Sequence, residues 1–354
     1  MKPGNILKGF LAFVITLIIL ELFLRWSGTS SAAFVIDDDN LGRVLRPNTN
    51  IILVNEGFFM GRVNRGGYLG PYYPEEKPSQ TVRIALIGDS FVAGLQLFGR
   101  YHFRTIMEQS LKDSLSDSVQ VLNFGYGGFN LERMFIYYKL SVLQFHPDYV
   151  LFFIGTDDFI EGERQLGPNL KVEDGKLTIE SSFRNTGAYR ITKKLRVLRD
   201  TAFYSLLKKA REFYRAGEIL KIIFDKVYLL FNPPHNAAEA DSASMVDPDR
   251  MALGRSILSE LANETKTAII FVVKNRLNDT IRNDIQNAHL TILDPKNDLD
   301  DLRTKNINPY YWPATSQSGH WNYFAHKAIG LYLASEMEKL IKADRAQIKP
   351  KSQK

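Results

Sequence analysis

The segment Val82-Arg-Ile-Ala-Leu-Ile-Gly88-Asp89-Ser90-Phe91 decides the fold class. Its first six residues form a nearly continuous apolar run rich in β-branched side chains, which is typical of a strand whose two faces are both covered. A turn follows at Gly88, and a helix-compatible run begins near Ser90. Ser90 therefore lies at the carboxyl end of a strand, where open α/β sheets bind their ligands.

Four further apolar runs repeat this pattern, and amphipathic helical segments separate or follow them. We expect strands at 82–87, 119–124, 149–154, 267–273 and 290–293, and helices at about 101–116, 131–144, 248–264 and 323–342. Strands that alternate with helices in this order predict a parallel, doubly wound sheet of five strands.

Composition narrows the possible classes of protein. The 354 residues are 45% hydrophobic and include no cysteine, which excludes a largely disordered chain, a disulfide scaffold and a thiolate metal site. The net charge is +6, and the stretch 190–231, where eleven Lys or Arg oppose four acids, alone carries +7, so the rest of the chain is close to neutral. The histidines show no metal-ligand spacing and no nucleotide phosphate loop is present, so we expect no metal, no cofactor and no nucleic-acid partner.

The amino terminus has the pattern of a membrane anchor. An apolar run from Gly9 to Leu24 follows Lys2 and Lys8 and ends at Arg25. Positive charge before the run predicts a cytoplasmic tip, a single transmembrane helix and an extracytoplasmic body, periplasmic if two membranes are present. The alternative is a signal peptide cleaved at the small residues 30–32.

The remaining chain divides at changes in composition. We expect an anchor at 1–26, an exported stem at 27–80, an α/β domain at 81–343 and a basic tail at 344–354. The stretch from about 160 to 246 interrupts the strand–helix alternation, which predicts a helical cap insertion. Its apolar part, 219–231, fits a cap helix packed on the sheet, or an amphipathic surface resting on anionic lipid.

Three later segments belong with Ser90 because each follows a strand or precedes the last helix. They are Asn123-Phe-Gly125-Tyr-Gly127-Gly128, Gly155-Thr156-Asp157-Asp158 and Gly319-His320-Trp321-Asn322. Together with Gly88-Asp89-Ser90, this pattern resembles the SGNH or GDSL hydrolases. The resemblance covers roughly residues 60–340, the insertion excepted, and implies a flavodoxin-like SGNH hydrolase fold.

The resemblance also implies roles for individual residues. Ser90 matches the family's nucleophile, Gly128 an oxyanion-hole donor and His320 the base. Asp157 occupies the position of the family's oxyanion asparagine, and an ionised carboxylate opposes the negative charge that such a site stabilises. The family's triad aspartate falls on Gln317 or Ser318, neither of which can stabilise an imidazolium, so the triad acid is unknown.

Several acids precede the His320 loop and are candidates for the missing member of the triad. They are Asp294, Asp298, Asp300 and Asp301. Without such an acid, Ser90 and His320 would act as a dyad.

Three functions are compatible with these residues. The first is a membrane-anchored serine esterase that hydrolyses O-acyl esters, O-acetyl esters above all, of envelope carbohydrate or lipid. The second is an acyltransferase, in which a sugar hydroxyl replaces water in the deacylation step. The third is a catalytically degenerate fold that binds a glycan or a partner, which Asp157 and the unmatched acid favour. Neither the natural substrate nor the oligomeric state follows from the sequence.

Overall fold

A computed structural model describes residues 3–27, 34–54, 56–115, 117–160, 166–173, 176–215 and 247–348. The apolar segment 219–231, interpreted above as a cap helix or a lipid surface, lies outside the described residues. So does the end of the basic tail, from residue 349.

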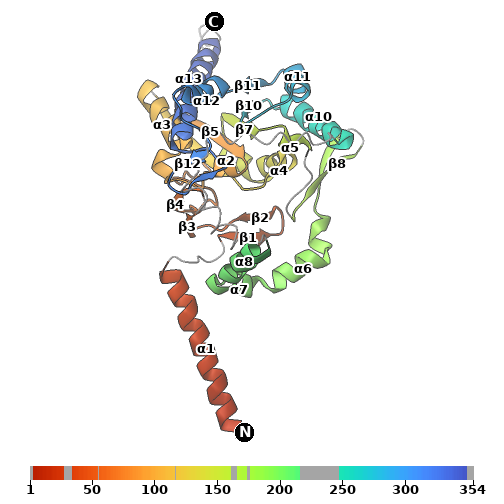
Figure 1. Cartoon of the computed structure of the whole chain (residues 1–354). Coiled ribbons are helices and arrows are strands. Elements are labelled where there is room, and N and C mark those ends of the chain that lie inside the picture. The colour runs from red at the N-terminus through yellow and green to blue at the C-terminus, as the bar shows by residue number, and fades with distance from the viewer. Residues whose placement is uncertain are drawn as a thin grey trace.

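The centre of the molecule is a five-stranded parallel sheet (Figure 1). Its strands are β5 (Thr81–Gly88), β6 (Ser118–Gly125), β7 (Tyr149–Ile154), β10 (Ala268–Val273) and β11 (Thr291–Leu293). They lie in the order β11-β10-β7-β5-β6, which is the flavodoxin-like order. The predicted fold class and all five predicted strands are confirmed.

The sheet is buried on both faces because successive side chains of a strand point to opposite sides. Ala85 and Ile87 of β5 pack in one hydrophobic cluster, which includes residues of α4 (Leu131–Tyr137), α10 (Pro248–Ala262) and α11 (Asp279–Asn287). Ile84 and Leu86 pack in the other, with α3 (Phe103–Ser114), α12 (Lys296–Thr304) and α13 (Tyr323–Ile348). These two helical layers explain why the strands read as continuous apolar runs.

Two hairpins precede the sheet in the chain. They consist of β1 (Val35–Asp38) with β2 (Gly42–Leu45), and β3 (Asn50–Val54) with β4 (Phe58–Arg62). Ile51 of β3 and Val63 after β4 are fully buried in the same cluster as Ile87. The segment expected to be a stem therefore contributes to the core of the body, and its boundary at residue 80 stays a prediction.

The predicted insertion contains helices and one hairpin. The hairpin pairs β8 (Asn169–Glu173) with β9 (Lys176–Glu180), and the helices are α6 (Gly187–Lys194), α7 (Arg196–Arg199) and α8 (Ala202–Arg215). The remaining elements are short: α2 (Ser90–Ala93), α5 (Asp157–Ile160), β12 (Tyr311–Trp312), β13 (Gln317–Ser318), and single turns at Gly99–Tyr101, Tyr138–Val142, Leu143–Phe145 and Ser182–Asn185.

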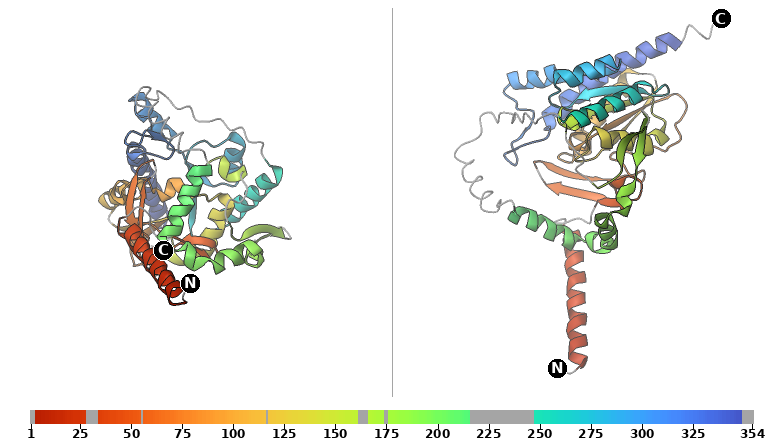
Figure 2. Two further views of the ribbon diagram at one scale, coloured as in Figure 1. Left: turned by 60° about the horizontal axis from the view of Figure 1, so that its bottom comes forward. Right: turned by 90° about the vertical axis from the view of Figure 1, so that its right-hand side faces the viewer.

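Helix α1 (Pro3–Trp26) extends away from the folded body (Figure 1). Among the described residues, it is the one helix that is long and apolar enough to cross a membrane, over Gly4–Trp26. Its apolar stretch is not buried against the rest of the chain. Figure 2 shows that only its carboxyl-terminal end approaches the body.

Candidate active site

Ser90 begins α2 directly after β5. The turn is tight: a Cβ on Gly88 would lie 2.4 Å from the Val92 side chain, so the position requires glycine. Asp89 caps the short helix by accepting a hydrogen bond of 2.9 Å from the backbone N–H of Phe91. The turn therefore holds the Ser90 side chain at the carboxyl edge of the sheet.

Ser90, His320 and Glu56 form a continuous hydrogen-bonded chain. The Ser90 Oγ lies 2.7 Å from His320 Nε2. On the other side of the ring, His320 Nδ1 lies 2.9 and 3.0 Å from the two carboxylate oxygens of Glu56. A carboxylate accepts at Nδ1, so the neutral ring carries its proton there and leaves Nε2 to accept the proton of Ser90. This is the geometry of a serine–histidine–acid triad.

The triad acid comes from an unexpected part of the chain. Glu56 lies between β3 and β4, in the hairpin before the sheet. A Cβ on Gly319 would lie 2.1 Å from Glu56 Oε1, so the glycine beside His320 makes room for the carboxylate. The acid is thus built into the packing of the hairpin against the His320 loop.

Two aromatic residues fix the position of the His320 loop. The indole N–H of Trp312 donates a hydrogen bond of 2.9 Å to the carbonyl of His320. The ring of Phe91 lies 4.8 Å from the imidazole, centroid to centroid. These contacts orient the imidazole ring toward Ser90. The side chain of His320 is 25% exposed to solvent.

The acids expected to replace the missing triad residue lie elsewhere. Asp294 pairs with Arg282 at 2.6 Å, Asp300 with Arg303 at 2.5 Å and Asp301 with Lys305 at 2.6 Å. Asp298 lies in the first turn of α12. None of these four candidate acids is the carboxylate bonded to His320 Nδ1, because Glu56 occupies that place.

The glycine-rich loop after β6 lies beside Ser90. A Cβ on Gly125 would lie 2.2 Å from the backbone nitrogen of Ala93, and one on Gly127 would lie 3.8 Å from the Ser90 Cβ. Gly128 adopts a φ of 84°, which glycine accommodates without strain. Gly128 therefore belongs to a loop that approaches the nucleophile closely, as its expected role requires.

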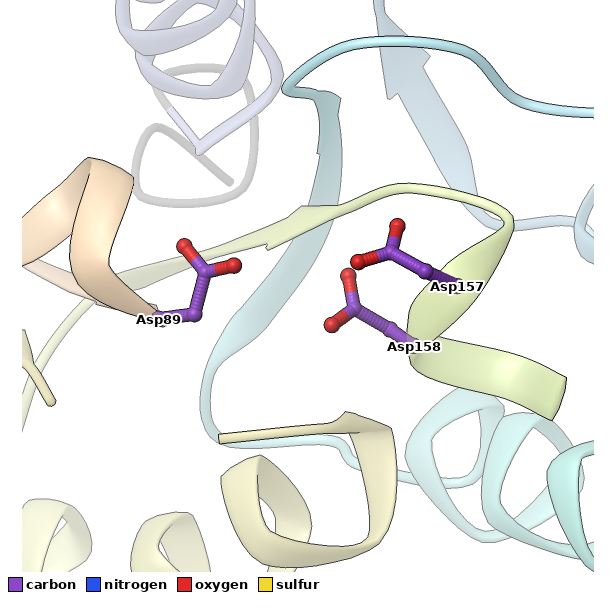
Figure 3. A group of neighbouring side chains, drawn as sticks. All are labelled: Asp89, Asp157 and Asp158. Atoms are coloured by element: carbon purple, nitrogen blue, oxygen red, sulfur yellow. The ribbon is translucent and has the colours of Figure 1, made fainter. Parts of the chain in front are cut away.

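Asp157 takes part in a buried ionic cluster that the sequence did not suggest. Asp89, Asp157 and Asp158 point toward one another (Figure 3). The ammonium of Lys274 lies among them, at 2.5 Å from Asp89, 2.8 Å from Asp158 and 3.3 Å from Asp157. Lys274 follows β10 and is only 1% exposed. Its ammonium fills the position that a metal ion would take among three carboxylates.

Burial and charge act against each other in this cluster. Burial lowers the pKa of Lys274, but the charges of Asp158, Asp89 and Asp157 outweigh that effect and raise it, so the ammonium stays charged. Burial also raises the pKa of Asp158 to about 7, with Asp157 and Asp89 adding to the shift and Lys274 opposing it. Asp158 further accepts a hydrogen bond of 2.8 Å from the N–H of Gly155.

Two buried histidines support α2 from behind. His102 Nδ1 accepts from the N–H of Arg104, so Nε2 donates to the carbonyl of Val92 at 3.0 Å. Burial lowers the pKa of His102 to about 3 and that of His326 well below its ordinary value. Both rings are therefore neutral and serve packing rather than proton transfer.

Residues 84–187 match the family model described as GDSL-like Lipase/Acylhydrolase. This stretch of the chain is therefore similar to the GDSL-type acylhydrolases. No curated protein is significantly similar to it in sequence.

Three solved structures illustrate what the chain is similar to. A putative lipolytic protein of the G-D-S-L family from Desulfitobacterium hafniense is 12% identical over 72% of this chain and 98% of its own, with a TM-score of 0.36. The acetyl xylan esterase AlAXEase is 14% identical over 72% and 99%, with a TM-score of 0.39. An acetylxylan esterase from Geobacillus stearothermophilus is 12% identical over 72% and 93%, with a TM-score of 0.37. Similarity at this sequence identity and TM-score carries no information on the substrate of this chain.

Glu56 and Lys274 are the two site residues that sequence reasoning missed. Glu56-Gly57 is a turn between two apolar runs, a signal no stronger than that of any surface hairpin. Lys274 directly follows the apolar run 267–273 and so lies at the same sheet edge as Ser90. The sequence offered one signal for Lys274. It is a basic residue at the end of one strand, and two other strands end near the acidic residues Asp89 and Asp157-Asp158.

Proposed function

We propose that this chain is a membrane-anchored serine esterase with Ser90 as nucleophile, His320 as general base and Glu56 as triad acid. The observation that carries the proposal is the continuous chain of hydrogen bonds from Ser90 Oγ through the His320 ring to Glu56. The expected substrates are O-acyl esters, O-acetyl esters above all, of envelope carbohydrate or lipid.

The reaction follows from the positions of the protons. His320 Nε2 takes the proton of Ser90 as Oγ bonds to the ester carbonyl carbon, and Glu56 stabilises the imidazolium that forms. His320 then gives this proton to the departing alcohol, which leaves Ser90 acylated. A water molecule, deprotonated by the same nitrogen, attacks the acyl carbon, and the carboxylate product leaves as Ser90 regains its proton.

The developing oxyanion needs donors that are in place before the reaction. The backbone N–H groups of Ser90 and Gly128 suit this role because Ser90 begins a helix and the Gly128 loop lies beside it. The Asp157 side chain accepts from Lys274 and cannot donate while ionised. The oxyanion site therefore depends on the backbone, with Lys274 balancing part of the negative charge nearby.

Membrane anchoring rests on α1. Its length and exposed apolar surface fit a bilayer span, and the preceding basic residues favour a cytoplasmic amino terminus. A periplasmically active reporter fused after Lys354 tests this orientation. Activity outside the cytoplasm is expected, and activity of a cytoplasm-specific reporter contradicts it.

A fluorophosphonate probe tests the nucleophile directly. The full-length protein in detergent is expected to be labelled, and Ser90→Ala is expected to lose the label. Acetate release from acetylated polysaccharide, followed with and without added sugar acceptors, then separates hydrolysis from acyl transfer. An unlabelled parent protein that binds the polysaccharide would instead support the degenerate binding function.

A further inference from the structure

The insertion presents an apolar and basic surface that nothing in the described chain covers. Its apolar members are Ile191, Leu195, Val197 and Leu198, which are 59%, 44%, 80% and 61% exposed. Among the described residues, only Trp26 is a more exposed large apolar side chain than Val197. We call the outer side of α6 and α7, with these four residues, the α6–α7 face.

Charge on the same helices has one dominant sign. Residues 187–201 include five basic side chains and one acid, a net charge of +4. Lys193 pairs with Asp39 and Arg199 with Asp37, both at 2.9 Å, so the basic side chains left for the outer side are Arg190, Lys194 and Arg196. Exposed apolar groups mixed with Lys and Arg are the composition of helices that rest on anionic lipid.

The opposite side of these helices is fixed to the body. Tyr189 is buried and donates a hydrogen bond of 2.6 Å to Asp39, and Arg199 pairs with Asp37 at 2.9 Å. Both acids belong to the hairpin of β1 and β2, Asp37 within β1 and Asp39 in its turn. Because the inner side is held by these contacts, the outward position of Val197 and Leu198 is a defined feature of the fold.

Helix α1 ends against the same region. The carboxylate of Glu21 accepts hydrogen bonds from the first N–H groups of α8, at 2.8 Å from Ala202 and 3.0 Å from Phe203. Arg25 bonds both Glu21, at 2.6 Å, and the carbonyl of Asp200, at 3.2 Å. The corner between α7 and α8 is therefore docked on the last turns of α1 (Figure 2).

This docking sets the depth of the surface. Glu21 lies five residues before Trp26, the end of α1, which corresponds to about 7–8 Å along a helix. Amphipathic helices at a membrane interface lie about 5–10 Å within the boundary between headgroups and acyl chains. Figure 1 shows α6, α7 and α8 across the end of the body that faces α1.

We propose that the α6–α7 face rests on the bilayer beside α1 and binds anionic phospholipid headgroups. The proposal rests on the proposed membrane anchoring of α1. The four apolar side chains enter the boundary with the acyl chains, and the surrounding Lys and Arg contact the headgroups. Such contact gives the body a fixed orientation on the membrane in place of free rotation on a tether.

The absence of cysteine allows a site-specific test on the full-length protein. An environment-sensitive fluorophore is attached to a single introduced cysteine in each of three variants: Val197→Cys, Phe13→Cys within α1 and Leu331→Cys on α13. Leu331 is a matched control because it is apolar, 48% exposed and part of α13, which Figure 1 shows across the body from α1. Each protein is reconstituted in phosphatidylcholine vesicles with or without phosphatidylglycerol, and nitroxide-bearing lipids quench the fluorophore.

If the α6–α7 face rests on the bilayer, the labels at Phe13 and Val197 should be strongly quenched in phosphatidylglycerol vesicles. The label at Leu331 should be unaffected. Lys194→Glu with Arg196→Glu should reduce quenching at Val197, whereas Lys339→Glu with Lys342→Glu on α13 should not. Retained labelling of Ser90 by a fluorophosphonate shows that each variant is folded.

Each other outcome overturns a defined part of the proposal. Quenching at Phe13 without quenching at Val197 rejects the lipid surface and leaves the anchor standing. No quenching at either position rejects both. Equal quenching at Val197 in vesicles without phosphatidylglycerol rejects the recognition of anionic lipid. If Val197 is protected from an aqueous quencher but is not quenched by nitroxide-bearing lipids, a protein partner or a second copy covers it instead.

Discussion

Two ionic groups of different kinds flank Ser90. On one side, Glu56 and His320 are 17% and 25% exposed and share one proton along a hydrogen bond. On the other, Lys274 and Asp158 are 1% and 3% exposed and belong to a cluster of four charges. The first group is partly open to solvent, whereas Lys274 and Asp158 at the centre of the second are buried. The comparison indicates that chemistry depends on the exposed group and structural integrity on the buried one.

The largest expected effect comes from removing the triad charge. Glu56→Gln keeps the size of the side chain but no longer stabilises the imidazolium or enforces its orientation, so kcat should fall about 10³–10⁴-fold. Steady-state hydrolysis of an acetyl ester measures it, and Asp301→Asn is the control that should leave kcat unchanged. A Glu56→Gln enzyme as fast as the parent would show that Ser90 and His320 act as a dyad.

Removing the buried cation should chiefly affect folding. Lys274→Met leaves Asp89 and Asp158 buried without their counter-charge, which should cost about 3–5 kcal/mol of unfolding free energy. Denaturant titration measures the loss. Adding Asp158→Asn to Lys274→Met should restore part of the stability; a double variant no more stable than the single one would refute charge burial as the cause.

Asp157 is the solvent-exposed member of the buried group. It is 41% exposed, and its replacement by Asn returns a permanent donor near the position where the oxyanion forms. Because Lys274 already balances part of its charge, we expect acetyl-ester turnover to rise only roughly tenfold, less than the full value of one oxyanion donor. A slower Asp157→Asn enzyme at every pH would assign the carboxylate a positive role.

The smallest effect concerns the pH dependence of stability. Asp158 has a pKa raised by burial from 3.8 to about 7, so the folded state binds its proton more tightly than the unfolded state. Its stabilising contribution is complete below pH 3.8 and is lost progressively as the pH rises toward 7. Denaturant titrations from pH 4 to 8 should show a flatter profile for Asp158→Asn. An unchanged profile would place the titrating group elsewhere.

The sequence was sufficient for the sheet because its strands are local, continuous apolar runs. Their order along the chain, with a turn signal after each, also placed Ser90, the Gly128 loop, Asp157 and His320 at one edge. The catalytic roles of these residues remain predictions, although the structure brings Ser90 and His320 into hydrogen-bonding contact.

Local sequence patterns could not predict Glu56 and Lys274, the charged partners of these residues. Glu56 lies 264 residues before His320, and Lys274 lies 185 residues after Asp89. Each pairing depends on how separate loops meet in three dimensions, and neither residue has a distinctive neighbour in the sequence. The family's usual spacing directed attention to acids near His320, whereas the chemistry requires only a carboxylate at Nδ1, whatever its position in the chain.

The separation of the triad also has a consequence for biosynthesis. Glu56 is made first and His320 last, 264 residues later, an interval of roughly 13–50 s at about 5–20 residues per second. The nascent chain carries the nucleophile and the acid through most of its synthesis without the base between them. For the proposed esterase, activity is therefore expected only after the segment around His320 has emerged and docked, so a chain that still lacks this segment should not cleave the esters around it.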